Sequence, residues 1–192
     1  MPVTDYLVRN AELYPDEVAL VELNPDEKDT RRTTWKEFDL IQPINNMPYR
    51  REITWSVFNE KANRFANMLI SRGVKKGDKV AILMYNCLEW LPIYFGVLKT
   101  GAIAVPFNFR YDSDEIYYCA ELAQVDVIVF GFAFIGRIEV NAERLSRGRL
   151  LIYVGDNCPS FAESYHELVA DCSSKEPDVK ITEDDYGAIY FS

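Results

Sequence analysis

The 192-residue sequence predicts an α/β fold in which a doubly wound, mostly parallel sheet carries helices on both faces. Three observations support this prediction. From Ile53 onward, short apolar runs alternate with segments of helical periodicity. The runs are apolar on both sides, as in parallel strands that helices cover on both faces. Right-handed crossovers between such strands then wind the sheet in both directions.

Residues 1–52 break this rhythm, and we expect two units. Residues 1–52 should hold a helix and a partial hairpin from a second, incomplete sheet, while residues 53–192 form the α/β unit. The run VALVEL at 18–23 predicts a strand. Segment 31–38 repeats the basic pair, the Thr-Trp and the later Phe of segment 50–58. Because only the second copy leads into an amphipathic helix, we interpret the first as a loop insertion.

The first long helix of the α/β unit is predicted from one apolar stripe at steps of three and four residues: Trp55, Phe58, Ala62, Phe65, Ala66 and Leu69. Gly73 should end it in the left-handed conformation, with Val74 making the apolar contact of that motif. Asn86, with Glu89 three places later, predicts a capping box for the next helix. Pro92 should then kink that helix, because it would lie beyond the first turn.

Later helices are expected at 113–122, 134–145 and 161–170. Asp112 or Ser113 is the predicted cap of the first of these. Five apolar runs are the candidate strands of the parallel sheet: 79–84, 102–105, 125–130, 149–154 and 187–191.

Composition excludes several classes of protein. The net charge is −9, from 30 acidic and 21 basic residues, which disfavours nucleic acid as a partner. The nearest basic cluster, Arg144 with Arg147 and Arg149, is interpreted as a solvated helix end. No apolar run is long enough to span a membrane, and residues 1–10 lack a secretory signal, so we expect a cytoplasmic protein.

The familiar catalytic and metal-binding motifs are absent from the sequence. The four cysteines are scattered and His166 is the one histidine, so a zinc site is disfavoured. The turn after the first apolar strand has no glycine for a dinucleotide, and there is neither a Gly-x-x-x-x-Gly-Lys loop nor a Gly-x-Ser-x-Gly elbow. His166 is interpreted as a surface residue and Glu183 to Asp185 as a solvated turn. We expect no complete catalytic constellation within the chain.

The final apolar run leads directly into Ser192. Ligands of open parallel sheets bind where strands end at their carboxyl side. A chain that stops there is expected to be a truncated one.

Three blocks, in this order, resemble the adenylate-forming enzymes that include AMP-forming fatty acyl-CoA synthetases. The first contains ITWSVFNE at 53–60, ANRFA at 62–66 and GVKKGDKVA at 73–81. The second contains Asn86, Glu89 with Trp90, and LKTGAIAVPFN at 98–108. The third is DYGAIYFS at 185–192. In that family, the third block leads into a loop that holds the ATP phosphates.

The resemblance implies a two-step ligase that uses ATP, Mg²⁺ and CoA to convert a fatty acid into acyl-AMP and then acyl-CoA. It assigns Ser192 to the start of the phosphate loop and Arg137 to a region where some relatives contact the CoA 3′-phosphate. For Arg137, a solvated surface residue is the competing interpretation. No catalytic or metal-ligating residue is assigned within the chain. The chain alone is therefore expected to be inactive and to bind no cofactor tightly.

Two other functions stay open at this point. The chain could be a standalone α/β interaction or regulatory module, or part of an adenylation domain that loads a carrier protein. The resemblance also implies that the strand at 18–23 pairs with residues 51–55 in a sheet completed by other parts of the enzyme. Without those parts, we expect a disordered hairpin or a homodimer formed through its free edge.

Overall fold

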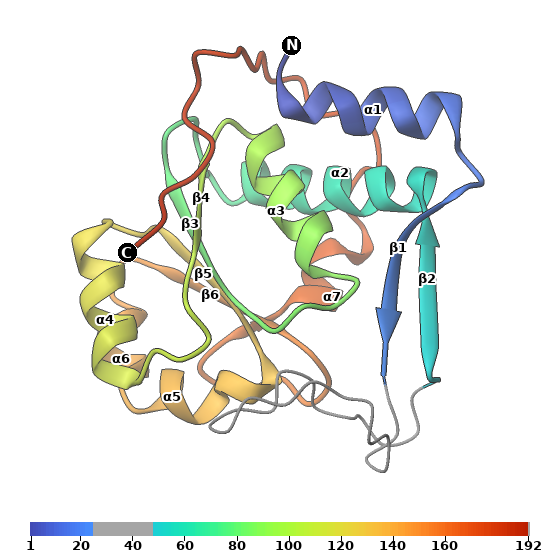
Figure 1. Cartoon of the computed structure of the whole chain (residues 1–192). Helices are drawn as coiled ribbons and strands as arrows, with labels where there is room; N and C mark the ends of the chain where they lie inside the picture. Colours follow the sequence, from blue (N-terminus) through green and yellow to red (C-terminus); the bar gives the residue numbers. More distant parts are fainter. Residues whose placement is uncertain (25–47, 192) are drawn as a thin grey trace.

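A computed structural model describes residues 1–24 and 48–191 (Figure 1). Its main sheet is parallel throughout and has the strand order β4-β3-β5-β6-β7. The strands are β3 (Lys79–Leu83), β4 (Ile103–Pro106), β5 (Val127–Gly131), β6 (Leu150–Val154) and β7 (Glu163–Ser164). The first strand of the sheet in chain order therefore lies between the second and the third, which is a doubly wound arrangement.

Helices cover both faces of this sheet, as the sequence predicts (Figure 1). One face carries α2 (Trp55–Ser71), α3 (Trp90–Lys99) and α7 (Tyr165–Ala170), with α1 (Val3–Leu13) packed outside α2. The other carries α4 (Ser113–Leu122), the 3-10 turn η1 (Phe132–Phe134), α5 (Ile135–Glu139) and α6 (Ala142–Leu145). Side chains of β3 alternate between the two cores, with Val80 and Ile82 on the α2 side and Ala81 and Leu83 on the other.

Two predicted helix ends are confirmed in atomic detail. Gly73 has φ +87° and follows α2, and the Val74 amide donates to the Leu69 carbonyl at 3.0 Å. Val74 also packs against the α2 side of the core, which completes the motif that ends a helix in the left-handed conformation. Asp112 caps α4 in a full capping box, since its side chain accepts from the Glu115 amide and the Glu115 side chain accepts from the Asp112 amide.

The expected start of α3 at Asn86 is wrong. The helix begins at Trp90, Glu89 is its N-cap without a side-chain cap bond, and residues 84–89 form a loop. Pro92 is therefore the third residue of the helix instead of lying beyond its first turn. The amide that proline lacks has no partner within the helix at this position, so the predicted kink has no cause.

Two further helices are shorter than expected. The predicted helix at 134–145 divides into α5 and α6, with Asn141 between them donating its side-chain amide to the Ser113 carbonyl at 2.9 Å. The predicted helix at 161–170 begins only at Tyr165, because Glu163 and Ser164 pair with β6 as strand β7. Ser164 then caps α7 by accepting from the Glu167 amide. Pairing with a neighbouring strand overrides local helical spacing here.

The predicted strand at 187–191 is also wrong as a full strand. It forms one parallel bridge, Ala188 with Ala104 at the outer side of β4, and no longer ladder. The fifth strand of the sheet is β7 at the opposite edge. Tyr190 of this run is 69% exposed, while Ala188, Ile189 and Phe191 are partly buried against the two cores.

The N-terminal hairpin forms a separate two-stranded antiparallel sheet from β1 (Val18–Leu23) and β2 (Arg50–Thr54). Its Leu20 and Ile53 pack on Phe58 of α2, together with Leu7 of α1. The strand at 18–23 is thus confirmed, and it pairs with residues 50–54, shifted by one residue from the predicted 51–55. The repeated segment 31–38, interpreted as an insertion, lies outside the described residues. Among the residues described, no helix is both long and apolar enough to cross a bilayer.

Candidate functional site

The carboxyl edge of the sheet at β3 and β5 is where this topology places a ligand. The connection from β3 leads to one neighbour, β4, and the chain then crosses back to β5 on the other side of β3. In doubly wound sheets, ligands bind at the carboxyl ends of the strands beside such a switch point. Three aromatic rings gather here, since Tyr85 lies 5.7 Å from Phe109 and 5.2 Å from Phe134 between ring centroids.

Arg137 of α5 lies at this edge and joins its helix to the loop after β4. Its Nη1 donates to the carbonyl oxygens of Phe109 at 2.6 Å and Tyr111 at 3.0 Å, in the loop that follows β4. The guanidinium carbon lies 5.5 Å from the centroid of the Phe134 ring. The side chain is half-buried, and its assignment to the CoA 3′-phosphate stays a prediction.

A polar cluster joins the loop after β3 to the inner face of the hairpin. Glu22 accepts from Arg51 Nη2 at 2.7 Å and from the Leu88 amide at 2.9 Å. Beside it, burial and then the charge of Glu89 raise the pKa of the Cys87 thiol to about 12. A thiol with such a pKa is protonated at neutral pH and is not an activated nucleophile. The cluster therefore fixes the hairpin and supplies no catalytic cysteine.

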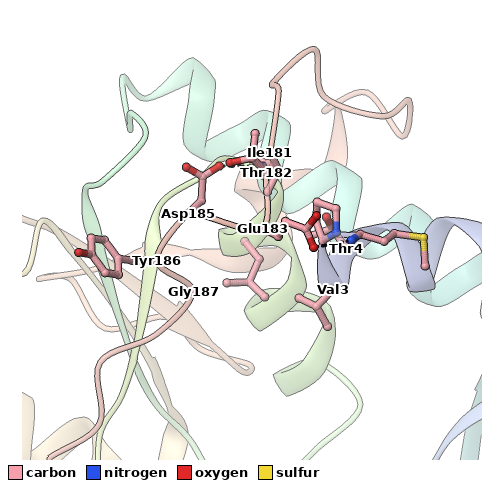
Figure 2. A pocket seen from close by; sticks show the side chains of 12 residues that line it. Val3, Thr4, Ile181, Thr182, Glu183, Asp185, Tyr186 and Gly187 are labelled. Carbon is pink, nitrogen blue, oxygen red and sulfur yellow. Dashed lines mark hydrogen bonds and ion pairs between the residues drawn. The ribbon is translucent and has the colours of Figure 1, made fainter.

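A cavity of about 220 Å³ lies at the opposite, amino edge of the sheet (Figure 2). Its wall combines the start of α1, the end of α3 and segment 181–187. Both carboxylates on this wall are engaged: Glu183 pairs with the Met1 ammonium at 2.8 Å and Asp185 with Lys76 Nζ at 2.7 Å. Hydrogen bonds from these cations lower the pKa of each carboxyl. Residues 183–185 form a turn with Glu183 and Asp184 exposed, as predicted, and two of its carboxylates make ion pairs in addition.

Comparison with known proteins now decides the family. Residues 7–192 match the family described as AMP-binding enzyme. The chain belongs to this family. It is 31% identical over 134 residues to the long-chain-fatty-acid–CoA ligase FadD13 of Mycobacterium tuberculosis, over 69% of this chain and 25% of the relative. It is 38% identical over 84 residues to the crotonobetaine/carnitine–CoA ligase of Salmonella enteritidis PT4, over 44% of this chain and 16% of the relative.

Solved structures show the same fold. A fatty acyl CoA synthetase of Mycobacterium tuberculosis superposes with a TM-score of 0.73 at 24% identity, over 98% of this chain and 32% of that one. The anthranilate CoA ligase AuaEII, in complex with anthranoyl-AMP, gives a TM-score of 0.78 at 22% identity, again over 98% and 32%. The chain thus corresponds to the N-terminal part of acyl-CoA ligases and spans a quarter or less of the curated relatives described above.

The structure of this AMP-binding family member also contains a polar cluster around the buried Lys99 that we did not predict from the sequence. Lys99, with a side chain only 3% exposed, bonds Glu176 at 2.5 Å and the Asn59 side-chain oxygen at 2.8 Å. Asn63 donates to the Ser174 carbonyl, and Asn67 donates to the carbonyls of residues 173 and 175. Asparagines at intervals of four on one helix are the signal that could have revealed it. The cluster fastens segment 170–176 to α2 and α3.

The site residues assigned by resemblance are placed only in part. Arg137 lies at the carboxyl edge, whereas Ser192 lies outside the described residues. His166 is exposed and packs on Tyr165, away from any carboxylate partner within the described chain. Across residues 1–24 and 48–191, no group of three His, Cys, Asp or Glu side chains could hold a metal ion.

Proposed function

We propose that the chain is the N-terminal part of an enzyme that activates a carboxylic acid with ATP and transfers the acyl group to CoA. The observation that supports this most strongly is the family match over residues 7–192, together with relatives whose names state CoA ligation. The proposed acid is a fatty acid, as the name of FadD13 suggests. The transfer of the acyl group to free CoA, and not to a carrier protein, is part of the proposal.

The proposed reaction has two balanced steps. A carboxylate oxygen of the acid attacks the α-phosphorus of ATP, the bond to the bridging oxygen breaks, and acyl-AMP and pyrophosphate form. The thiol sulfur of CoA then attacks the acyl carbonyl, the proton of the thiol is lost, and AMP leaves. Both steps build up negative charge that positioned donors must stabilise.

Within this reaction, we assign the described residues a supporting role. The sheet presents the loops after β3, β4 and β5 at one edge, where three aromatic rings and Arg137 hold them together. Arg137 is our candidate contact for the CoA 3′-phosphate, since a guanidinium can share its donors between loop carbonyls and a phosphate. Ser192 is our candidate for the first residue of the phosphate loop.

The 192-residue chain alone is proposed to be inactive. It covers 16% and 25% of the two ligases described above, and we propose that residues outside it supply most of the active site. Loss of one donor to a charged transition state costs on the order of a hundredfold in rate. Loss of several should leave no measurable adenylation.

Exchange of labelled pyrophosphate into ATP tests the proposal. We expect no exchange by the 192-residue chain with fatty acids of short, medium or long chain, and clear exchange by a protein extended to the length of the ligases. Addition of CoA to the extended protein should then yield acyl-CoA. Robust exchange by the short chain would show that the active site is misplaced, and an extended protein inactive with every carboxylic acid would contradict the ligase function.

A further inference from the structure

Segment 186–191 lies against β4 with little backbone pairing, while its Tyr190 hydroxyl lies 3.3 Å from that of Tyr94 and its Phe191 ring packs near Phe107. Two backbone hydrogen bonds make the bridge: the Ala104 amide to the Gly187 carbonyl and the Ile189 amide to the Ala104 carbonyl, both at 2.9 Å. By contrast, β3 and β4 pair over four successive positions, residues 79–82 with residues 103–106. A slip of two residues would keep the same faces inward and move the chain by about 6.6 Å. Something outside the bridge must help to select the register.

The turn just before this segment is tied firmly to the rest of the molecule. Asp185 Oδ2 lies 2.7 Å from Lys76 Nζ and also accepts from the Thr182 amide at 2.8 Å. Lys76 Nζ donates in addition to the Lys180 carbonyl at 3.4 Å. Figure 2 shows Asp185 and Thr182 together on this turn, beside the cavity at the amino edge. One ion pair therefore joins the turn to the loop between α2 and β3.

Lys76 is itself held relative to the start of β4. The neighbouring Gly77 amide donates to the Gly101 carbonyl at 2.9 Å. The Lys76 stem lies so close over Gly101 that a β-carbon at that position would come within 2.8 Å of Lys76 Cγ. Gly101 also has φ +74°, so glycine is required there for two reasons. The backbone at Lys76 is thus held beside the start of β4, and the side chain, 49% exposed, extends from there to Asp185.

Two stretches of equal length lead to the bridge, one along β4 and one along the C-terminal segment. Gly101 is three residues before Ala104, and Asp185 is three residues before Ala188. Gly101 and Asp185 both line the cavity at the amino edge, so holding Asp185 there through Lys76 favours the pairing of Ala188 with Ala104. We propose that Lys76 and Asp185 are positioning residues that set the register of segment 186–191 on β4. Resting on the proposed function, we extend the inference to ATP, because segment 186–191 leads in sequence to Ser192, our candidate for the first residue of the phosphate loop.

Amide hydrogen exchange of the 192-residue chain, followed by NMR, tests the structural half. Lys76→Met and Asp185→Asn should each speed exchange of the Ile189 amide by roughly fivefold to tenfold, the scale expected for a partly exposed ion pair and its hydrogen bond. Asp184→Asn, a neighbouring carboxylate outside the anchor, is the matched control and should change exchange by less than about twofold. The Val129 amide of β5 should keep its protection in all three variants.

Further variants keep the test decisive. Lys76→Arg retains the cation, so its Ile189 amide should be protected as in the parent protein. In Lys76→Met or Asp185→Asn, a nuclear Overhauser contact of Ala104 with Tyr186 or Tyr190 in place of Ala188 would show a slipped register directly. Equal Ile189 exchange in Lys76→Met, Asp185→Asn and the control would overturn the proposal. If the Val129 amide also exchanges faster in Lys76→Met, that variant is unfolded more broadly. The Ile189 exchange of Asp185→Asn, compared with that of Asp184→Asn, then tests the proposal.

Kinetics of the extended protein test the functional half separately. Asp185→Asn should raise the KM for ATP several-fold with a smaller change in the KM for the carboxylic acid, and Asp184→Asn should change neither. An unchanged KM and kcat, alongside faster Ile189 exchange, would overturn the link to ATP and leave the register role standing. An extended parent protein without adenylation would instead contradict the proposed function, while the exchange result would still judge the register.

Discussion

Gly96 marks the closest approach of α2 and α3, and its replacement by alanine should destabilise the protein. A β-carbon on Gly96 would lie 2.9 Å from the Ala62 carbonyl oxygen and 2.9 Å from Phe65 Cδ1. The first atom belongs to the backbone of α2, so no rotamer change can move it away. Phe65 is fully buried, so its ring has no free space to enter. The two helices must therefore separate by a few tenths of an ångström.

The magnitude follows from two opposing effects. Overpacking of a well-packed core costs about 1–3 kcal/mol. Alanine in a helix interior is better than glycine by about 1 kcal/mol, which offsets part of this cost. We expect the clash to prevail, because both contacts lie in the core, and to lower the free energy of unfolding by about 1–2 kcal/mol. For a chain of this size, the Tm should fall by roughly 2–8 °C.

Gly136→Ala provides the matched control within the same molecule. Gly136 lies in α5, has no left-handed backbone, and a β-carbon there would meet no atom within 4 Å. The same substitution should therefore stabilise the protein by up to about 1 kcal/mol. Urea denaturation followed by circular dichroism measures both variants. If Gly96→Ala is as stable as the parent, or shifts in the same direction as Gly136→Ala, the close approach of α2 and α3 is not as described.

Two further predictions concern pH and association. Burial alone would raise the pKa of the Glu176 carboxyl, but hydrogen bonds from Lys99 and two asparagines outweigh burial and lower it. The ionised Glu176 therefore stabilises the folded state above the unfolded-state pKa of about 4.3. This stabilisation is lost as the pH falls through the lower, folded-state pKa. Glu176→Gln should therefore be less stable than the parent at pH 7, and its Tm should depend less on pH on the acid side; parallel Tm profiles would contradict this. We also propose that the free edge of the β1–β2 hairpin mediates a homodimer of the 192-residue chain. Light scattering should detect this dimer. A monomer whose hairpin amides are protected from hydrogen exchange would count against the proposal.

Much of the candidate site was open to prediction from the sequence, though only at the level of its scaffold. The runs at 79–84, 125–130 and 149–154 are almost continuously apolar, so both faces of each strand are apolar. This pattern predicts central strands of a parallel sheet. The resemblance assigned Arg137 to the CoA region, and the structure places it at the carboxyl edge with two loop carbonyls. The bond to those carbonyls could not be predicted, because residues 109 and 111 meet Arg137 only after the crossover through α4.

The sequence alone determined the features that depend on neighbours within a few residues. The capping box of Asp112 with Glu115 and the left-handed Gly73 are of this kind, since each is closed by the chain's own next turn. Only the tertiary structure decided whether an apolar run became a buried strand. Segment 187–191 reads as one, yet it lies at the outer side of β4 with a single bridge, and the two-residue β7 takes the opposite edge. Burial and strand pairing depend on groups from distant parts of the chain, as the contact of Lys76 with Asp185 also does.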